Sequence, residues 1–423
     1  MEVTTVRFSR LPQFLPVATL ALAMPLVTAC APACNAVDSW TWGTCFSDMH
    51  GSDSSEVNSE IDNAPAAAQA DTVERARPLV RALLFEDNLP GLSLAVSVAG
   101  EIVWAEGFGW ANIEERQPVT PQTRFRIGGT AKPMTATAVG LLVERGQLDI
   151  GLSARSYVPS FPEKAWPITT RQLMGHVAGI RHHDEDDEML YRRTSCSGPL
   201  DALGIYADDS LRFEPGMAFE YSSYGWMLVG AVVEAAAGEP FLDFMQREVF
   251  DPIGMRDTVL DDPARPAAET TAFYWPFASV DTKTGIEYAN NPDNSCLQGA
   301  AGLLSTPSDV VRFGAAMLDG RLIAAETLDM LSTPVVLDSG ESTGHSLGWS
   351  VRQIPTGPAS AETTVFGHDA ISAGGTTSFV TVPEYGVVIA VTANVSHARN
   401  LSSLTAQLVD LFVESSSPNP DGR

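Results

Sequence analysis

The sequence predicts an α+β fold in which one antiparallel sheet is built from both termini of the folded segment and is flanked by helices. Residues 92–98 and 102–110 have the pattern of a strand hairpin around Ala99-Gly100. Residues 378–382 and 387–391 have the same pattern around a Pro-Glu-Tyr-Gly turn. The stretch between them, about residues 133–330, shows mostly helical spacing and loops. Together these observations indicate a layered sheet that carries a mainly helical insertion.

One helix is expected outside each hairpin. Before the first hairpin, apolar residues recur at helical spacing from Val73 to Leu84, and Asp71 can cap the start of that helix. After the second hairpin, four leucines lie on one helical face, at positions 401, 404, 408 and 411. A helix–hairpin at the start and a hairpin–helix at the end favour a single sheet to which both termini contribute.

Charge and composition set the limits of the folded part. The chain has 423 residues, with 26 basic and 52 acidic residues and a formal net charge of −26. Such an acidic surface repels phosphate backbones, so nucleic-acid partners are excluded. Residues 30–70, rich in small and polar residues in their later part, are expected to form a disordered tether. The domain is then predicted over 71–414, with a disordered tail at 415–423.

The N-terminus has the pattern of a targeting segment. Arg7 and Arg10 precede an apolar run that is too short and too rich in proline for a membrane span, which predicts a signal peptide over 1–29. Val27-Thr28-Ala29-Cys30 resembles a bacterial lipobox, in which Cys30 would carry lipid. An ordinary signal cleaved nearby is the alternative. Either predicts an exported bacterial protein, periplasmic or membrane-anchored, which contacts the membrane only through Cys30.

The five cysteines fit an oxidising compartment. If Cys30 carries lipid, four cysteines remain, and the simplest pairing joins Cys34 to Cys45 and Cys196 to Cys296.

Lys132 stands near the start of an expected helix, three residues after Gly129. Residues three apart share a helical face, so a serine at 129 could pass its proton to Lys132, with the helix N-terminus stabilising nearby negative charge. Gly129 has no side chain and cannot be a nucleophile. Thr130 carries a hydroxyl and is the alternative nucleophile, but residues two apart on a helix point about 200° away from each other.

Two later segments place further polar side chains next to predicted elements. Tyr221-Ser222-Ser223 follows a Phe-Glu-Pro-Gly turn and precedes a helical pattern. His368 and Ala370 lie in Phe-Gly-His-Asp-Ala, shortly before the last hairpin.

Together the three segments resemble the motifs of the beta-lactamase-related serine hydrolases, S-x-x-K, Y-x-N and K-T-G or H-x-G. The resemblance covers about residues 75–413 and is nearest to the mitochondrial beta-lactamase-like branch. It implies catalytic positions at Gly129, Lys132, Tyr221 and His368, and substrate contacts at Ser223 and Ala370. The chain departs from the motifs at three positions: Gly129 replaces the nucleophile, Ser223 replaces Asn, and Ala370 replaces Gly. The Cβ of Ala370 would crowd the substrate or tilt the strand edge.

The resemblance also bears on the cysteines. In relatives, the loops that correspond to those of Cys196 and Cys296 approach the rim of the active-site cleft, which supports a bond between them.

Two competing signals are present. Gly344-His345-Ser346-Leu347-Gly348 matches the nucleophile elbow of α/β-hydrolases, with Asp369 and His397 as partners, but a strand pattern follows Ser346 where that elbow needs a helix. The run from His182 to Glu188 could bind a divalent cation, but it lacks EF-hand or zinc spacing, so a solvated acidic loop is favoured and no metal is expected.

Three functional hypotheses follow. The favoured one is a degenerate serine hydrolase that binds a small molecule, such as a peptide, cell-wall fragment or ester, without covalent turnover. The second is an active peptidase, esterase or beta-lactamase that uses an unusual nucleophile, or water held by Lys132, Tyr221 and His368. The third is an α/β-hydrolase that uses Ser346. None of them requires a cofactor.

Overall fold

The computed structural model describes residues 49–62, 64–184, 194–276, 285–289, 292–356 and 361–416. The predicted signal peptide, Cys30, Cys34 and Cys45 lie outside these residues, as do most of the predicted acidic loop and tail. Among the described residues, no helix has the length and apolar character needed to cross a membrane.

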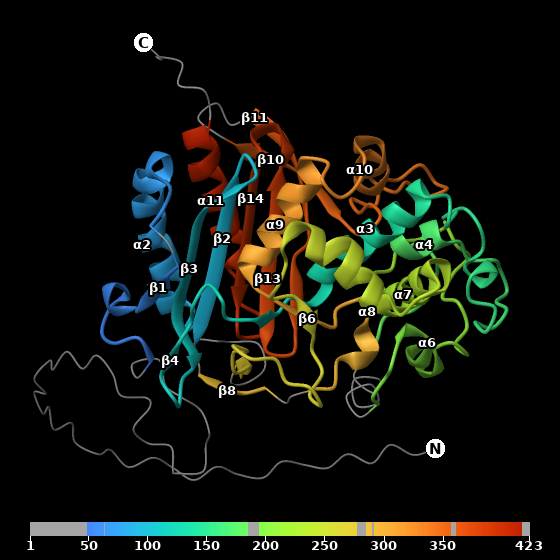
Figure 1. The fold of residues 1–423 in the computed structure, drawn as a ribbon, viewed down its shortest axis with the longest axis horizontal. Helices are drawn as coiled ribbons and strands as arrows, with labels where there is room; N and C mark the ends of the chain where they lie inside the picture. Colours follow the sequence, from blue (N-terminus) through green and yellow to red (C-terminus); the bar gives the residue numbers. More distant parts are fainter. Residues whose placement is uncertain are drawn as a thin grey trace, which may run out of the picture. The chain divides into compact units, whose positions relative to one another are not determined.

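A nine-stranded antiparallel sheet forms the centre of the domain and confirms the predicted fold class (Figure 1). Its main path runs in the order β1-β3-β2-β14-β13-β11-β10, and β4 and β12 pair with β3 and β13. The first and last hairpins therefore meet at the middle of the sheet, where β2 lies beside β14 and Val96 is opposite Ile389. The strands are β1 (Ser59–Ile61), β2 (Gly91–Val98), β3 (Glu101–Asn112), β4 (Gln117–Pro118), β10 (Ser350–Thr356), β11 (Ala361–Gly367), β12 (Ala370–Ser372), β13 (Gly375–Val382) and β14 (Val387–Ala393).

Two apolar layers cover the two faces of the sheet (Figure 1). Leu94 and Val96 pack with α2 (Ala70–Glu86) and α11 (Leu401–Ser416), whereas Ala95 between them points to the other face and to α9 (Pro307–Leu318). This alternation follows from the two-residue period of a strand. The remaining helices are α3 (Ala131–Glu144), α4 (Thr170–Met174), α6 (Pro199–Ala202), α7 (Ser223–Ala237), α8 (Phe241–Phe244) and α10 (Ala325–Ser332).

Two small sheets complete the helical region. One has the order β5 (Phe125–Arg126), β9 (Leu303–Ser305) and β6 (Val259–Leu260), and the other pairs β7 (Tyr274–Pro276) with β8 (Ile286–Tyr288). Strand β5 leads directly into the turn that holds Gly129, so this small sheet helps to place the start of α3.

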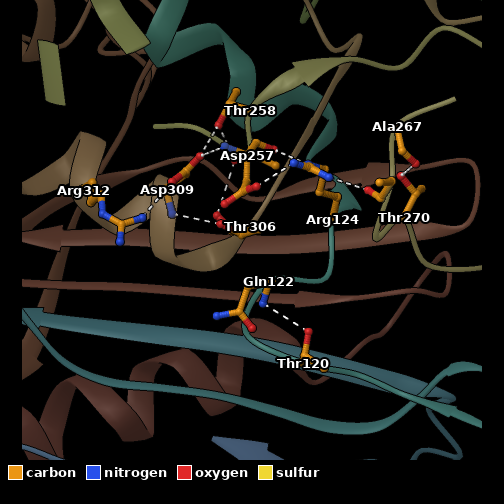
Figure 2. A network of polar contacts seen from close by, with 12 residues as sticks. Thr120, Gln122, Arg124, Asp257, Thr258, Ala267, Thr270, Thr306, Asp309 and Arg312 are labelled. Atoms are coloured by element: carbon orange, nitrogen blue, oxygen red, sulfur yellow. Dashed lines mark hydrogen bonds and ion pairs between the residues drawn. The ribbon is translucent and has the colours of Figure 1, made fainter. Parts of the chain in front are cut away.

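A polar network ties the three-stranded sheet to α9, as Figure 2 shows. The buried carboxylate of Asp309 accepts hydrogen bonds from the Asp257 backbone N–H at 2.8 Å and from the Thr258 hydroxyl at 3.0 Å. Asp309 also lies in the first turn of α9, where a negative charge is favourable. The Arg124 guanidinium, next to β5, binds the Asp257 carboxylate at 2.6 Å.

The segment before α2 differs from its prediction. A disordered tether was expected to residue 70, but β1 pairs with β3, with Ser59 opposite Phe108, and Met49 and Val57 are buried in the apolar layer of α2 and α11. These isolated apolar residues have no periodic spacing, so the sequence pattern did not reveal their burial. At the other end, α11 continues to Ser416, two residues into the predicted tail.

Candidate active site

The first predicted motif lies at the start of α3. Residues Gly128–Thr130 form a short 3₁₀ turn that continues into α3, and this helix is buried over almost its whole length. Gly128 adopts a φ of +52°, which favours glycine, whereas Gly129 is not in the left-handed region. The backbone at 129 would therefore accept a residue with a side chain.

Lys132 is fully buried beside the cavity of the site. Its Nζ donates hydrogen bonds to the Ser223 hydroxyl and to the carbonyl of Ala300, each at 3.2 Å. It also lies 4.8 Å from the centre of the Tyr221 ring. Because burial removes the ammonium form from water, the pKa of Lys132 falls to about 7, and much of the amine is uncharged at neutral pH.

Tyr221 and Ser223 are positioned by the start of α7. Ser222 caps this helix by accepting a hydrogen bond from the Gly225 N–H at 2.9 Å, and its own N–H donates to Nδ1 of His176 at 3.0 Å. The His176 ring stacks on the Tyr221 ring with 4.3 Å between their centres. Burial raises the pKa of Tyr221, so its hydroxyl keeps its proton at neutral pH.

His368 faces the Tyr221 hydroxyl in one tautomer. Its Nδ1 lies 3.0 Å from the backbone carbonyl of Asp369, which can only accept, so Nδ1 carries the proton. Nε2 is then free to accept from the Tyr221 hydroxyl, 3.4 Å away. Burial lowers the pKa of His368 well below its ordinary value, and the nearby Lys132 lowers it further, so the ring is neutral.

The position of the absent nucleophile is closed by its neighbours. A Cβ built on Gly129 would lie 2.7 Å from the Tyr221 hydroxyl oxygen and 2.8 Å from Cε1 of His368. Both distances are shorter than the contacts that real Cβ atoms make. The same point lies 3.3 Å from Nζ of Lys132. The structure therefore brings all four predicted catalytic positions together, and it fills the place of the serine side chain with groups of the site itself.

The two alternative nucleophiles are turned away from this cluster. The Thr130 hydroxyl is buried and donates to the backbone carbonyl of His368 at 3.0 Å. Ser346 is buried, its hydroxyl lies 3.3 Å from the carbonyl of Trp349, and strand β10 follows it. No helix follows Ser346 and the sheet is antiparallel, so the α/β-hydrolase hypothesis is wrong.

Ala370 begins the short strand β12, which pairs with β13 on one side and borders the cavity. Its Cβ lies 3.2 Å from the point where a Cβ on Gly128 would stand. The methyl group thus lies against the turn before Gly129, at the edge where the sequence predicted crowding.

A cavity of about 600 Å³ joins these side chains. Its wall includes Trp275 and Arg399, which no motif indicated, and His397, which the sequence suggested only as a partner of Ser346. They come from segments far apart in the chain, and no spacing rule connects such segments to the motifs. His182, predicted to lie in a solvated loop, also lines the cavity, and its ring lies edge-on to Tyr221 at 5.5 Å. Burial lowers the pKa of His182 to about 3.

One predicted disulfide is confirmed, since Cys196 and Cys296 are bonded. The backbone N–H of Cys196 also donates to the Ser295 hydroxyl at 2.9 Å. The neighbours Asn294 and Leu297 line the cavity, so the bond holds part of its wall. Within the described ranges, no group of His, Cys, Asp and Glu side chains has the arrangement of a metal site.

Comparisons with known proteins agree with this arrangement. A family model described as Beta-lactamase matches residues 76–411. The chain is 28% identical to the mitochondrial serine beta-lactamase-like protein of Homo sapiens over 348 residues, 63% of each chain, so the match spans less than two thirds of that relative. It is 26% identical to penicillin-binding protein 4* of Bacillus subtilis over 60% of this chain and 58% of the relative. It is 31% identical to esterase EstB of Burkholderia gladioli over 47% of this chain and 52% of the relative.

Solved structures show the same fold. The octameric penicillin-binding protein homologue from Pyrococcus abyssi aligns with a TM-score of 0.68 at 21% identity, over 82% of this chain and 78% of that one. The D-amino acid amidase from Ochrobactrum anthropi, complexed with L-phenylalanine, aligns with a TM-score of 0.63 at 21% identity, over 82% of this chain and 96% of that one.

Proposed function

Because the chain belongs to the beta-lactamase family, we propose that it uses the family site to bind a small-molecule or peptide ligand without forming an acyl-enzyme. The observation that carries the proposal is Gly129, which stands three residues before Lys132 where the S-x-x-K serine belongs. The Tyr221 hydroxyl and the His368 ring lie close to the place of the missing side chain. Lys132, Tyr221 and His368 are kept around a cavity of about 600 Å³.

The proposed ligands carry an amide or ester group. Its relatives include penicillin-binding proteins, a D-aminopeptidase and an esterase, and a structural neighbour is a D-amino acid amidase. The cavity wall combines an aromatic ring at Trp275 with polar groups at Asn294 and Ser402. Such a wall suits a peptide, cell-wall fragment or ester with an apolar body and a few polar atoms.

A calorimetric titration tests the binding. Benzylpenicillin, an N-acyl-D-alanyl-D-alanine peptide and phenyl acetate are titrated into the protein, and at least one is expected to bind. Trp275→Ala removes an aromatic wall of the cavity and is expected to weaken that binding about tenfold, equal to about 1.4 kcal/mol. Trp166→Ala is the matched control, because Trp166 lies outside this cavity and is 38% exposed. Equal weakening by both variants, or no binding at all, contradicts the proposal.

An active hydrolase is the second candidate, and one observation favours it. Lys132 has a pKa of about 7, so its uncharged amine could take a proton from a water molecule in the cavity. Steady hydrolysis of one of the three ligands, lost in Lys132→Met, would support this candidate in place of the binding protein.

We also propose that the protein is exported and anchored through lipid at Cys30. The apolar run and Val27-Thr28-Ala29-Cys30 support this proposal. Radiolabelled palmitate should be incorporated into the full chain in a bacterial host, and not into Cys30→Ser. Labelling of neither chain would contradict the lipid anchor.

A further inference from the structure

The amine of Lys132 is buried without a charged partner. Its Nζ contacts two hydrogen-bond acceptors, the Ser223 hydroxyl and the Ala300 carbonyl, and among the described residues it forms no ion pair. An uncharged amine has two N–H bonds and one lone pair. Because the two acceptors can take both N–H bonds, the lone pair is left to point elsewhere.

The space beside this nitrogen is the space that the serine side chain would have used. The Cβ point of Gly129 lies 3.3 Å from Nζ, and both Gly129 and Lys132 line the cavity. In a relative with the serine, its side chain would stand between a ligand and the lysine. Here the glycine places no side chain of its own between the cavity and the amine, and only the ends of the Tyr221 and His368 side chains lie over this point, so their displacement brings a ligand to the amine.

We propose that Nζ of Lys132 reversibly captures an aldehyde or ketone as an imine. Desolvated lysines next to a pocket are the ones that form Schiff bases with carbonyl compounds. The inference rests on the ligand-binding site proposed above, and it replaces the lost serine hydroxyl with the lysine amine as the nucleophile.

The chemistry balances without an oxidant or a cofactor. The nitrogen lone pair attacks the carbonyl carbon, the C=O double bond opens, and one amine proton moves to the oxygen to give a carbinolamine. The second amine proton then reaches the same hydroxyl, the C–O bond breaks, and water leaves as the C=N bond forms. Hydrolysis by water reverses each step and frees the ligand.

Tyr221 is placed to move these protons. Its hydroxyl lies 2.7 Å from the Cβ point of Gly129, beside the place where the carbinolamine would form. Burial raises the pKa of Tyr221, so the hydroxyl is protonated and can donate to the leaving oxygen. In the empty site this O–H can point to Nε2 of His368, 3.4 Å away, and the same single proton turns to the ligand oxygen when the carbinolamine forms.

The ligand class follows from the groups around the amine. Leu297, Ala301 and Ala370 give apolar atoms to the cavity that Lys132 lines. These residues suit a carbonyl group attached to an apolar body.

Benzaldehyde with sodium cyanoborohydride tests the inference, because this reductant converts an imine into a stable secondary amine. The sequence makes the experiment clean, since it contains only three lysines, Lys132, Lys164 and Lys283. Full-length protein is treated at pH 7 and digested, and the benzyl adduct is mapped by mass spectrometry. Benzyl alcohol, which has the same ring without the carbonyl, is the reagent control and should add nothing.

The adduct is expected on Lys132 at about ten times the level on either other lysine, because Lys132 lines the cavity and has no charged partner among the described residues. Lys132→Met should lose this adduct. Lys164→Met is the matched control and should keep it, because Lys164 donates to the backbone of Ala207 and Asp209 away from the cavity.

Adducts confined to Lys164, Lys283 or the N-terminus, or no adduct at all, would overturn the inference. If Lys132→Met does not fold, mapping in the unmodified chain and in Lys164→Met still decides. The titrations of benzylpenicillin and the other ligands stand apart from this result. Binding of a ligand without an adduct on Lys132 would contradict only the formation of an imine. Failure of all three ligands to bind would contradict the proposed function, even if the adduct forms.

Discussion

At the scale of single residues, Lys132 links the stability of the protein to pH. Its pKa is about 7 in the folded chain and is lowered from 10.5 by burial. Between these two values the unfolded chain binds a proton that the folded chain does not, so the free energy of unfolding rises with pH. The rise from this one group is at most about 1.4 kcal/mol per pH unit.

Lys132→Met should remove that rise. Urea unfolding at several pH values between 7.5 and 9.5 measures the slope of unfolding free energy against pH, and the variant should have the smaller slope. The absolute stability is less informative, because the variant also leaves the Ala300 carbonyl without its donor. Equal slopes in the two proteins would show that Lys132 is not buried as the structure has it.

Gly129→Ser tests what else the site has lost. The backbone at 129 accepts a side chain, but the new Cβ requires the tips of Tyr221 and His368 to move. We expect slow phosphonylation by fluorophosphonate, in which the serine oxygen bonds to phosphorus, fluoride leaves, and Lys132 takes the serine proton. Ala370→Gly in addition should speed this reaction if the methyl group crowds the substrate edge. No reaction in either folded variant would mean that the donors for the oxyanion are also lost, which costs about 2.7–4 kcal/mol of barrier per donor.

The motifs predicted which residues form the site better than they predicted how its side chains pack around Gly129. Gly129, Lys132, Tyr221 and His368 were found because their three segments resemble the motifs of the family. Trp275 and Arg399 were missed, and His397 was assigned to the wrong site, because only the tertiary fold brings their segments to the cavity. The Tyr221 hydroxyl lies close to Gly129 because distant segments of the chain pack together, and no local sequence pattern predicts such packing.

At the scale of elements, the start of α9 is held by one carboxylate. Asp309 accepts from the Asp257 N–H and the Thr258 hydroxyl, and its removal leaves the part-buried Asp257 N–H without this partner and Thr258 with only the Ser305 hydroxyl at 2.8 Å. Each unsatisfied group costs about 1–3 kcal/mol. Asp309→Ala should therefore lower the free energy of unfolding by about 2–4 kcal/mol, measured by urea denaturation.

The matched control lies at the other end of the same helix. Asp319 is the C-cap residue of α9, and its carboxylate pairs with the partly exposed Arg321. Exposed pairs contribute about 0–1 kcal/mol, so Asp319→Ala should change little. Similar losses in both variants would contradict a special role for the network around Asp309.

The length and apolar pattern of each element explain which parts of the fold the sequence predicted. The alternating strands β2, β3, β13 and β14 and the periodic helices α2 and α11 are long enough for their apolar faces to be recognised. Strand β1 has three residues and no buried side chain, so its place at the sheet edge comes only from its pairing with β3.

At the scale of the whole molecule, the disulfide between Cys196 and Cys296 crosses the helical region. It closes a loop with a sequence separation of 100. The chain-entropy model gives about 4.7 kcal/mol for such a loop, an upper value. Replacing both cysteines with serine should lower the melting temperature, and reductant should lower that of the unmodified protein but not that of the variant. An unchanged melting temperature in both cases would contradict the bond.

The central claim is that this member of the beta-lactamase family binds its ligand without a serine acyl-enzyme. The most direct test is the intact mass of the unmodified protein after exposure to fluorophosphonate and, separately, to benzylpenicillin. The account predicts an unchanged mass with both reagents, because Gly129 offers no hydroxyl and the Thr130 hydroxyl is bound to the backbone of His368. A stable adduct that maps to Thr130, Ser223 or another hydroxyl of the cavity would contradict the account and make the protein an active serine or threonine hydrolase.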